Sequence, residues 1–262
     1  MSKNKPMTFS YSKMATYAEC PYKYKCKYID KIPQQPKYYF SFGTAIHAAL
    51  EFMHAQSKMP SLAEIINYFA GIWNAKDWRD AGFPSSAKYA AFRYDGIAIL
   101  TKYYSKYASN PACITEYKTD VLIDNLLVRI IADKIQHKSG GHICIIDYKT
   151  GKNVMRNPEQ LMMYQKITEC DPALLARVRS IYGKKIKKII VDETIYLHVP
   201  SLEEHVFPRA TISEIKAFWD SALSIANNIR EAKFTPTPCD RACKWCDYKT
   251  RCPAIGNTGP DL

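Results

Sequence analysis

The sequence lacks any run of about 18 apolar residues, so we expect no membrane-spanning helix. Its first segment, Met1–Ser12, is polar and contains no apolar stretch, which argues against a secretory signal. It also has no internal repeat, no low-complexity linker and no G-x-x-x-x-G-K-[ST] motif, so nothing indicates a nucleotide-driven motor. We therefore expect a single compact α/β domain, residues 1–262, located in the cytoplasm.

Acidic residues are scarce relative to basic ones, and this favours a polyanionic partner. There are 25 Asp and Glu against 37 Lys and Arg, a formal net charge of +12 that attracts phosphates. Tyrosines alternate with lysines between Tyr17 and Tyr39, a mixture that suits both phosphates and unpaired bases. A half-buried helix with lysines reaching solvent would show the same composition. The candidate nucleic-acid contacts are Lys23, Tyr24, Lys27, Lys152, Lys184 and Lys185.

Hydrophobic periodicity and turn residues predict the order of helices and strands. Helices are expected over residues 10–31, 43–58, 61–80, 85–108, 157–169 and 211–232. Strands are expected over residues 114–123, 126–137, 142–149 and 186–199. Turn signals at Asp124-Asn125 and at Ser139-Gly140-Gly141 separate the first three strands, which predicts an antiparallel meander.

The second turn places two carboxylates opposite each other. A three-residue turn centred on Gly140 pairs Lys138 with His142 and His137 with Ile143, and by the same count Asp133 with Asp147. Opposed side chains have Cβ atoms about 4.5–5.5 Å apart, so the two charges repel each other. A divalent cation such as magnesium or manganese would relieve this repulsion.

Lys149 follows Asp147 by two residues, so the strand period puts both on one face. A lysine beside a metal can orient an attacking water or stabilise the charge of a pentavalent phosphorane. Asp-x-Lys also occurs by chance as a surface ion pair. The opposed Asp133 and the apolar run Ile143–Ile146 favour the catalytic interpretation.

Nine cysteines are many for a cytosolic chain, where disulfides are disfavoured. Near the C-terminus the spacing is Cys243-x2-Cys246-x5-Cys252-Pro253, in a polar stretch that predicts a metal site. Cys239 would complete a local four-cysteine set, for which zinc is the simplest occupant.

The stretch Ile145–Lys152 resembles the (I/V)-D-x-K-T-G signature of RecB-type nucleases in the PD-(D/E)XK superfamily. Other segments match that family in the same order, so the resemblance spans nearly the whole chain. They are Ser10–Tyr24 with its Cys20-Pro21, Gly43–His47, Ile131–Asp133 and Gln160–Tyr164. One departure is Ala132, where relatives usually have glycine before the aspartate.

The resemblance implies a restriction-endonuclease-like core, in which a central mixed sheet is flanked by helices. To this core it adds N-terminal helices and a C-terminal cysteine-rich segment. It also implies that Mg²⁺ or Mn²⁺ is bound by His47, Asp133, Asp147 and the main-chain carbonyl of Tyr148. Lys149 would be the catalytic lysine, and Gln160 and Tyr164 would position the DNA strand or that lysine. Glu116 is a weaker match to the acidic position on the family's first strand.

A second completion of the cysteine site also follows from the resemblance. In recombination nucleases and CRISPR-associated exonucleases of this family, an N-terminal cysteine joins three C-terminal ones around a [4Fe–4S] cluster. Here these would be Cys20, Cys243, Cys246 and Cys252, so residues 1–31 and 233–262 together would bind the cluster. The x2, x5 spacing and the Cys20-Pro21 pair favour this cluster over zinc.

The implied activity is that of a divalent-metal-dependent deoxyribonuclease that hydrolyses phosphodiester bonds with metal-activated water. We expect an exonuclease acting on single-stranded or frayed ends and leaving 5′-phosphates, in a prokaryotic cell or a phage-infected host. With no motor motif, any unwinding would come from a helicase or a recombination or integration partner. The alternative is an inactive nucleic-acid-binding or assembly module of the same fold, and RNA remains open as a substrate. The intact Asp133, Asp147 and Lys149 argue against a pure binder, which needs no opposed carboxylates beside phosphates.

Overall fold

The computed structural model describes residues 6–109, 113–152 and 157–255, and its chain divides into two compact units. Unit 1 comprises Met1–Gln35, Asp120–Arg129 and Thr211–Leu262. Unit 2 comprises Pro36–Thr119 and Ile130–Ala210. None of the helices in the described ranges combines the length and the apolar character needed to cross a bilayer.

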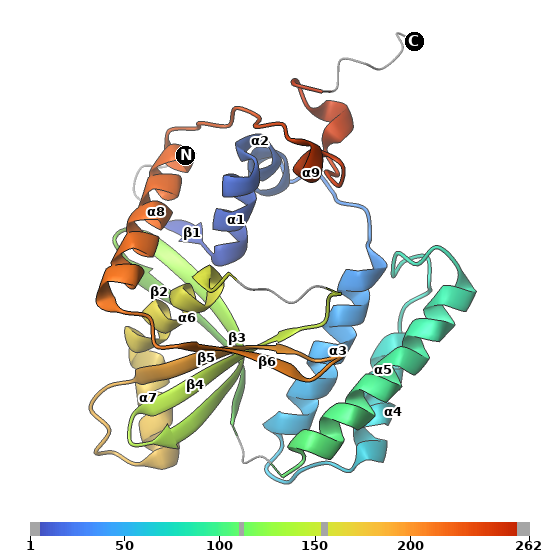
Figure 1. The fold of residues 1–262 in the computed structure, drawn as a ribbon, viewed down its shortest axis with the longest axis vertical. Coiled ribbons are helices and arrows are strands. Elements are labelled where there is room, and N and C mark those ends of the chain that lie inside the picture. The colour runs from blue at the N-terminus through green and yellow to red at the C-terminus, as the bar shows by residue number, and fades with distance from the viewer. Residues whose placement is uncertain (1–5, 110–112, 153–156, 256–262) are drawn as a thin grey trace. The chain divides into compact units, whose positions relative to one another are not determined.

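Unit 2 contains most of a mixed sheet (Figure 1). Its strands are β2 (Ile114–Ile123), β3 (Leu126–Ser139), β4 (His142–Lys149), β5 (Ile190–His198) and β6 (Glu203–Pro208), and the ends of β2 and β3 belong to unit 1. β3 pairs with β4 and β5 with β6 in antiparallel fashion, whereas β4 and β5 run parallel. β6 has no counterpart among the expected strands, because Leu202, with φ 61°, lets the chain reverse without a glycine that would have marked the turn.

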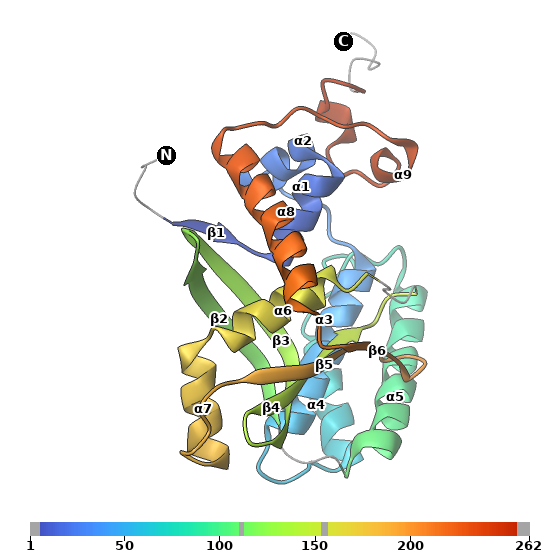
Figure 2. The same cartoon turned by 60° about the vertical axis from the view of Figure 1, so that its left-hand side comes forward.

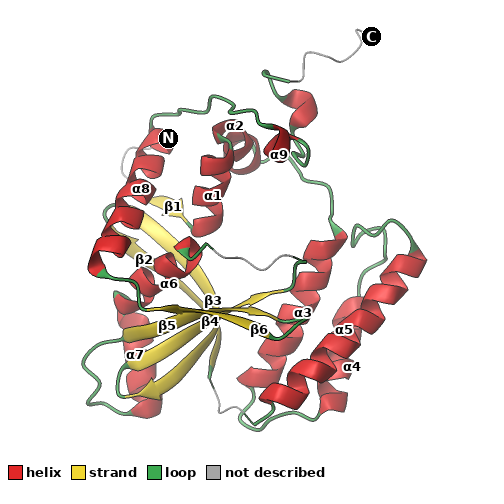
Figure 3. Ribbon diagram, viewed as in Figure 1, coloured by secondary structure: helices red, strands yellow, loops and turns green. Residues whose placement is uncertain are grey.

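Helices of unit 2 flank this sheet, as Figure 3 shows in red beside yellow. They are α3 (Tyr38–Ala55), α4 (Leu62–Asn74), α5 (Ser86–Tyr107), α6 (Glu159–Glu169) and α7 (Pro172–Tyr182). The buried core joins α3, α4 and α5 to Cys144, Ile146 and Tyr148 of β4. Because side chains alternate along a strand, Asp147 and Lys149 point to the opposite face, where α6 packs. The expected α/β fold, a mixed sheet flanked by helices, is thereby confirmed.

The β3–β4 register agrees with the expected one except next to the turn. Lys134 pairs with Ile146 and His137 with Ile143, and continuing this register by one residue brings Asp133 opposite Asp147. The expected pairing of Lys138 with His142 is wrong, because His142 pairs with Ser139 and the register shifts between His137 and Ser139. The turn is a two-residue Gly140-Gly141 turn instead of a three-residue one.

Both glycines of this turn are required by its geometry. Gly140 has a left-handed φ of 55°, which suits a tight hairpin. A Cβ on Gly141 would lie 1.9 Å from the carbonyl oxygen of Lys188, so only glycine allows this close approach.

Unit 1 contains the N-terminal segment and the C-terminal third of the chain. Its elements are β1 (Met7–Phe9), α1 (Tyr11–Glu19), α2 (Pro21–Tyr24), a π-helical turn (Lys25–Ile29), α8 (Ile212–Arg230), α9 (Asp240–Cys243) and a 3-10 turn (Lys249–Arg251). β1 pairs in parallel with the start of β3, and α1 contacts α8 (Figure 2). The Ser10 side chain caps α1, and a Thr211–Glu214 capping box starts α8.

The expectation of one helix over residues 10–31 is wrong, because the helix is interrupted at Cys20. Cys20 is extended, with φ −163° and ψ 116°. The ring of Pro21 disfavours a helical conformation at the residue before it, and the same proline then begins α2. The break therefore places Cys20 at a corner between two short helices.

Candidate active site

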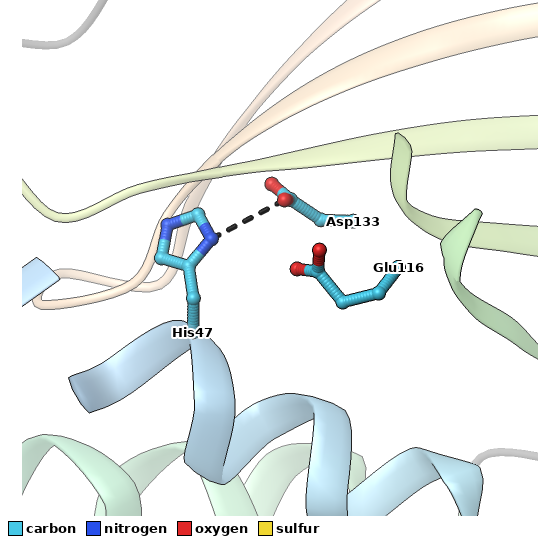
Figure 4. Close-up of side chains that lie close together, drawn as sticks. All are labelled: His47, Glu116 and Asp133. Carbon is cyan, nitrogen blue, oxygen red and sulfur yellow. Dashed lines mark hydrogen bonds and ion pairs between the residues drawn. The ribbon is translucent and has the colours of Figure 1, made fainter. Parts of the chain in front are cut away.

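Three side chains of unit 2 converge on one point, as Figure 4 shows. They are His47 of α3, Glu116 of β2 and Asp133 of β3, and their ligand atoms all lie within 4.8 Å of one another. Nδ1 of His47 is 3.2 Å from Oδ1 of Asp133. The other oxygen of Asp133, Oδ2, accepts a hydrogen bond from the main-chain N–H of Tyr148 at 2.6 Å. One carboxylate therefore links helix α3 to the strand that carries Asp147.

The charges of this trio, which we call the acidic trio, depend on one another. Burial and the nearby charge of Asp133 raise the pKa of Glu116 to about 7. Burial lowers the pKa of His47, but the hydrogen bond and charge of Asp133 outweigh it, so the net pKa is raised. A half-buried carboxyl group whose pKa is raised by a neighbouring carboxylate is typical of a site built for a cation. Two oxygen donors and one imidazole fit a divalent metal.

The acidic trio opens into a surface pocket of about 890 Å³. Its lining residues come from α3, β2, β3 and the segment after β4. They are Tyr39, Phe40, Gly43, Thr44, His47, Ala48, Glu51, Glu116, Asp133 and Thr150. A Cβ on Gly43 would lie 2.8 Å from Oγ1 of Thr150, so glycine here lets α3 approach the end of β4.

A second polar network surrounds Asp147, which is only 4% exposed. Burial and the charge of Asp133 raise the pKa of Asp147 to about 6, although Lys149 acts in the opposite direction. Nζ of Lys149 lies 2.6 Å from Oδ2 of Asp147. Apart from this ion pair, that oxygen has no partner among the described residues. Ionised Asp147 thus has one oxygen that only Lys149 contacts.

Gln160 and Tyr164 of α6 hold both partners of this ion pair. Gln160 Oε1 accepts a hydrogen bond from Lys149 Nζ at 2.9 Å, and its Nε2 donates to Oδ1 of Asp147 at 2.9 Å. Tyr164 Oη accepts from Gln160 Nε2 at 2.8 Å and donates to the same Oδ1 at 3.3 Å. The ammonium of Lys149 also lies 4.7 Å above the ring of Tyr196. Sequence reasoning missed Tyr196, because no local pattern connects a tyrosine of β5 to the lysine of β4.

A buried hydrogen-bonded chain supports Tyr148 from the core side. Tyr148 Oη lies 2.9 Å from Tyr103 Oη, which lies 2.9 Å from Nε2 of His54. His54 is 3% exposed, and burial lowers its pKa to about 3, so it is neutral at ordinary pH. The residue whose main chain holds Asp133 is therefore anchored at both ends.

A match to a protein-family model shows the family of this chain. A family model described as the PD-(D/E)XK nuclease superfamily matches residues 8–253.

The chain belongs to the PD-(D/E)XK nuclease superfamily.

Among solved structures, the nuclease is similar to a protein designated SSO0001, with 13% identity and a TM-score of 0.39 over 82% of this chain and 95% of that one. It is also similar to a candidate exonuclease from Eubacterium rectale, with 10% identity and a TM-score of 0.48 over 100% of this chain and 94% of that one. At these scores neither likeness bears on substrate or reaction. A search of curated proteins found no significant match.

The cysteine-rich part of the nuclease lies within unit 1. Four cysteines, Cys20, Cys243, Cys246 and Cys252, line one pocket of about 400 Å³, whereas Cys239 is exposed and lies outside that lining. Within the described ranges, no three cysteine sulfurs approach one another within 4.8 Å. All four cysteines of the expected [4Fe–4S] set share one pocket, whereas the fourth cysteine of the expected zinc set does not line it.

Hydrogen bonds tie the N-terminal and C-terminal segments of unit 1 together around these cysteines. Tyr22 donates to the carbonyl oxygen of Arg251 at 2.8 Å. Gln34 donates to the carboxylate of Asp247 at 2.6 Å, and Thr237 donates to the carbonyl oxygen of Glu19 at 3.2 Å. Hydrogen bonds thus join the segment around α2 to the segment after α8.

Of the six expected DNA contacts, one is buried, two contact neighbouring side chains and three are exposed. Tyr24 is 3% exposed and its ring stacks on Phe234, so it packs in unit 1 and offers no face to a base. The alternation of tyrosine and lysine in the sequence does not predict which rings are buried, so Tyr24 was wrongly expected to contact DNA. Lys23 pairs with Glu19 at 2.8 Å, and Lys27 lies 5.3 Å above the ring of Tyr28. The remaining candidates, Lys152, Lys184 and Lys185, are exposed.

Proposed function

We propose that this nuclease is a divalent-metal-dependent deoxyribonuclease. The observation that carries the proposal is the acidic trio, three metal-binding atoms within 4.8 Å, in the same unit as the Asp147–Lys149 ion pair. The membership in the PD-(D/E)XK superfamily supports hydrolysis of a nucleic-acid phosphodiester.

The metal site in this proposal combines the two networks. His47, Asp133, Asp147 and the main-chain carbonyl of Tyr148 bind Mg²⁺ or Mn²⁺, and Glu116 joins them because it completes the acidic trio. The bound ion neutralises charge on the scissile phosphate and lowers the pKa of water. Oδ2 of Asp147 is contacted only by Lys149, whose Nζ also donates to Gln160, so that ammonium keeps a partner when Oδ2 binds the ion.

Lys149 is the catalytic lysine of the proposal. Gln160 accepts from its Nζ, and the ring of Tyr196 lies beneath it, so the ammonium is fixed in direction before substrate arrives. From there it orients the attacking water or stabilises the charge that develops on the phosphate. Gln160 and Tyr164 act by holding Lys149 and Asp147, and their contacts to these residues favour that role over direct contact with the strand.

We further propose exonuclease action on single-stranded or frayed DNA ends, leaving 5′-phosphates. The charge of +12 supports a DNA partner. A helicase or a recombination or integration protein would supply the strand ends. We also propose a [4Fe–4S] cluster at Cys20, Cys243, Cys246 and Cys252, which their shared pocket supports over zinc at Cys239 and the last three, because exposed Cys239 lies outside that lining.

The test is degradation of end-labelled single- and double-stranded DNA with Mg²⁺, Mn²⁺ or EDTA. Cleavage should require metal, should start at ends, and should be lost in Asp147→Ala and Lys149→Ala while DNA binding persists. Lys138→Ala is the matched control, because Lys138 lies on the same hairpin but pairs with Glu193 at 2.8 Å. Near-normal cleavage by Asp147→Ala would refute the site assignment. Metal-independent binding without any cleavage would instead indicate the inactive binding module.

A further inference from the structure

The first turns of α3 carry four aromatic residues that divide into two pairs. Tyr38 and Phe42 pack inward, with ring centroids 5.3 and 5.1 Å from that of Phe92. Tyr39 and Phe40 point away from the core and are 48% and 65% exposed. Their own ring centroids are 4.7 Å apart. Rings left this exposed bury little apolar surface, so they contribute little to the stability of the fold.

The exposed pair lies at the mouth of the acidic-trio pocket. Tyr39 and Phe40 both line that pocket together with His47 and Asp133. Helical spacing explains the arrangement, since Phe40, Thr44 and His47 follow at i, i+4 and i+7 and so share one face of α3. The seven helical steps from Phe40 to His47 correspond to about 10 Å along the helix axis. A strand that reaches the acidic trio therefore passes within a few nucleotides of both rings.

The charges that line the pocket determine which part of a nucleic acid the two rings can bind. The pocket's charged lining consists of carboxylates and His47, so a phosphate is attracted only where a metal compensates. Uncharged rings at the mouth provide attraction of a different kind, to a flat apolar face. A base presents its face only when it has left the duplex stack, and aromatic side chains bind such bases regardless of sequence. A paired duplex offers the rings only a backbone edge.

We propose that Tyr39 and Phe40 form a stacking site for an unpaired nucleobase of single-stranded DNA. This inference rests on the proposed nuclease function, whose substrate class it specifies. The site makes the enzyme favour single strands by binding a base next to the scissile phosphate.

Binding is measured by fluorescence anisotropy with a labelled oligothymidylate and Mn²⁺, in a Lys149→Ala background that does not cleave. Tyr39→Ala/Phe40→Ala should raise the dissociation constant roughly 5- to 100-fold, as expected for loss of stacking. Phe40→Trp should bind as well as the parent, because it keeps a ring. Tyr94→Ala is the matched control, since Tyr94 is 68% exposed on α5 of the same unit but does not line the pocket.

The decisive experiment scans a single abasic site through the oligonucleotide. With intact rings, affinity should fall at one or two positions, and in Tyr39→Ala/Phe40→Ala the same abasic sites should cause no further loss. Equal binding of intact and abasic oligonucleotides at every position would overturn the proposal, as would an equal loss in Tyr94→Ala.

An unfolding measurement distinguishes the loss of base stacking from a loss of folding, and the binding result does not depend on cleavage. Both altered rings are exposed, so the unfolding midpoint of the double variant, with and without Mn²⁺, should match that of the parent. Should the double variant unfold early, Phe40→Gln alone is compared with Phe40→Trp in the abasic scan. If the parent protein never cleaves DNA, the nuclease proposal fails, yet position-dependent binding in the scan would still establish the stacking site.

Discussion

Gln160 donates a hydrogen bond to Asp147 and accepts one from Lys149, each over 2.9 Å. One neutral amide thus sets the direction of both members of an ion pair. Because an amide has a donor and an acceptor at a fixed spacing, neither a carboxylate nor an alkyl group of the same size can replace it.

Gln160→Leu should therefore lower kcat by roughly 10- to 100-fold with little change in KM, because small displacements of catalytic groups are costly. It also removes a donor to ionised Asp147, which raises the pKa of that carboxyl, so the acidic limb of the pH–rate profile should move upward. Steady-state kinetics across pH measures both effects.

The matched control is Gln165→Leu on the same helix, whose amide bonds to the main chain of Ala210. It should reduce stability without moving the pH profile. An increase in KM with unchanged kcat in Gln160→Leu would mean that Gln160 contacts the DNA instead.

Removing metal should make stability depend on pH through two acids. Burial and Asp133 raise the folded-state pKa of Asp147 from its ordinary 3.8 to about 6, and that of Glu116 from 4.5 to about 7. The stabilising contribution of both acids is fully present at pH values below their ordinary pKa. It is lost as pH rises through the raised pKa of the folded state. For Asp147 the loss by pH 7 is about 3 kcal/mol, at about 1.4 kcal/mol per pKa unit.

Urea unfolding in EDTA between pH 4.5 and pH 7.5 tests this, with Asp147→Asn as the comparison. The asparagine variant should lose less stability than the parent as pH rises. Saturating Mn²⁺ should oppose the trend, since the metal binds the ionised carboxylates. Parallel pH curves for parent and variant in EDTA would contradict the coupling of Asp147 to Asp133.

The imidazole of His47 should give manganese an advantage over magnesium. An imidazole nitrogen binds a transition ion such as manganese better than it binds magnesium, whose ligands are almost always oxygens. We expect half-maximal cleavage at a lower concentration of Mn²⁺ than of Mg²⁺, and this difference should shrink in His47→Asp. His47→Ala should weaken activation by Mn²⁺ at least roughly 10-fold.

Glu51→Gln serves as the control for His47, because Glu51 lines the same pocket but lies outside the acidic trio. It should leave the metal preference unchanged. Unaltered activation by Mn²⁺ in His47→Ala would show that the ion binds without the imidazole.

Cys20 should be as important as Cys246 for the colour and stability of the protein. If both bind one [4Fe–4S] cluster, anaerobically purified protein should be brown and contain iron and sulfide in equal amounts. Cys20→Ser and Cys246→Ser should each bleach and destabilise it, since a site that joins distant segments contributes to folding. Exposed Cys239 and Cys170 should tolerate serine. A colourless, zinc-containing protein that needs Cys239 but not Cys20 would establish the local zinc site.

The sequence allowed the strand register at the site to be predicted because that register follows a simple rule. Side chains alternate along a strand and a glycine turn fixes the pairing, so Asp133 and Asp147 could be placed near each other by counting. The separate roles of the two aspartates could not be predicted in this way. That Glu116 lies closest to His47 and Asp133, while Asp147 bonds to Gln160, depends on how α3 and α6 pack.

Other features required tertiary contacts that no local pattern contains. The ring of Tyr196 beneath Lys149 comes from a strand nearly fifty residues later in the chain. The break at Cys20 is different, because Pro21 was visible and the residue before a proline avoids the helix. The exposure of Phe40 beside buried Phe42 depends on which face of α3 meets the core.

Glu116 has a φ of 43°, a backbone conformation in which residues other than glycine and asparagine are strained. Such strain amounts to roughly 1–3 kcal/mol, which a glycine at this position would relieve. The fold therefore gives up some stability at this position to hold a carboxylate beside His47 and Asp133, as strained residues at functional sites commonly do.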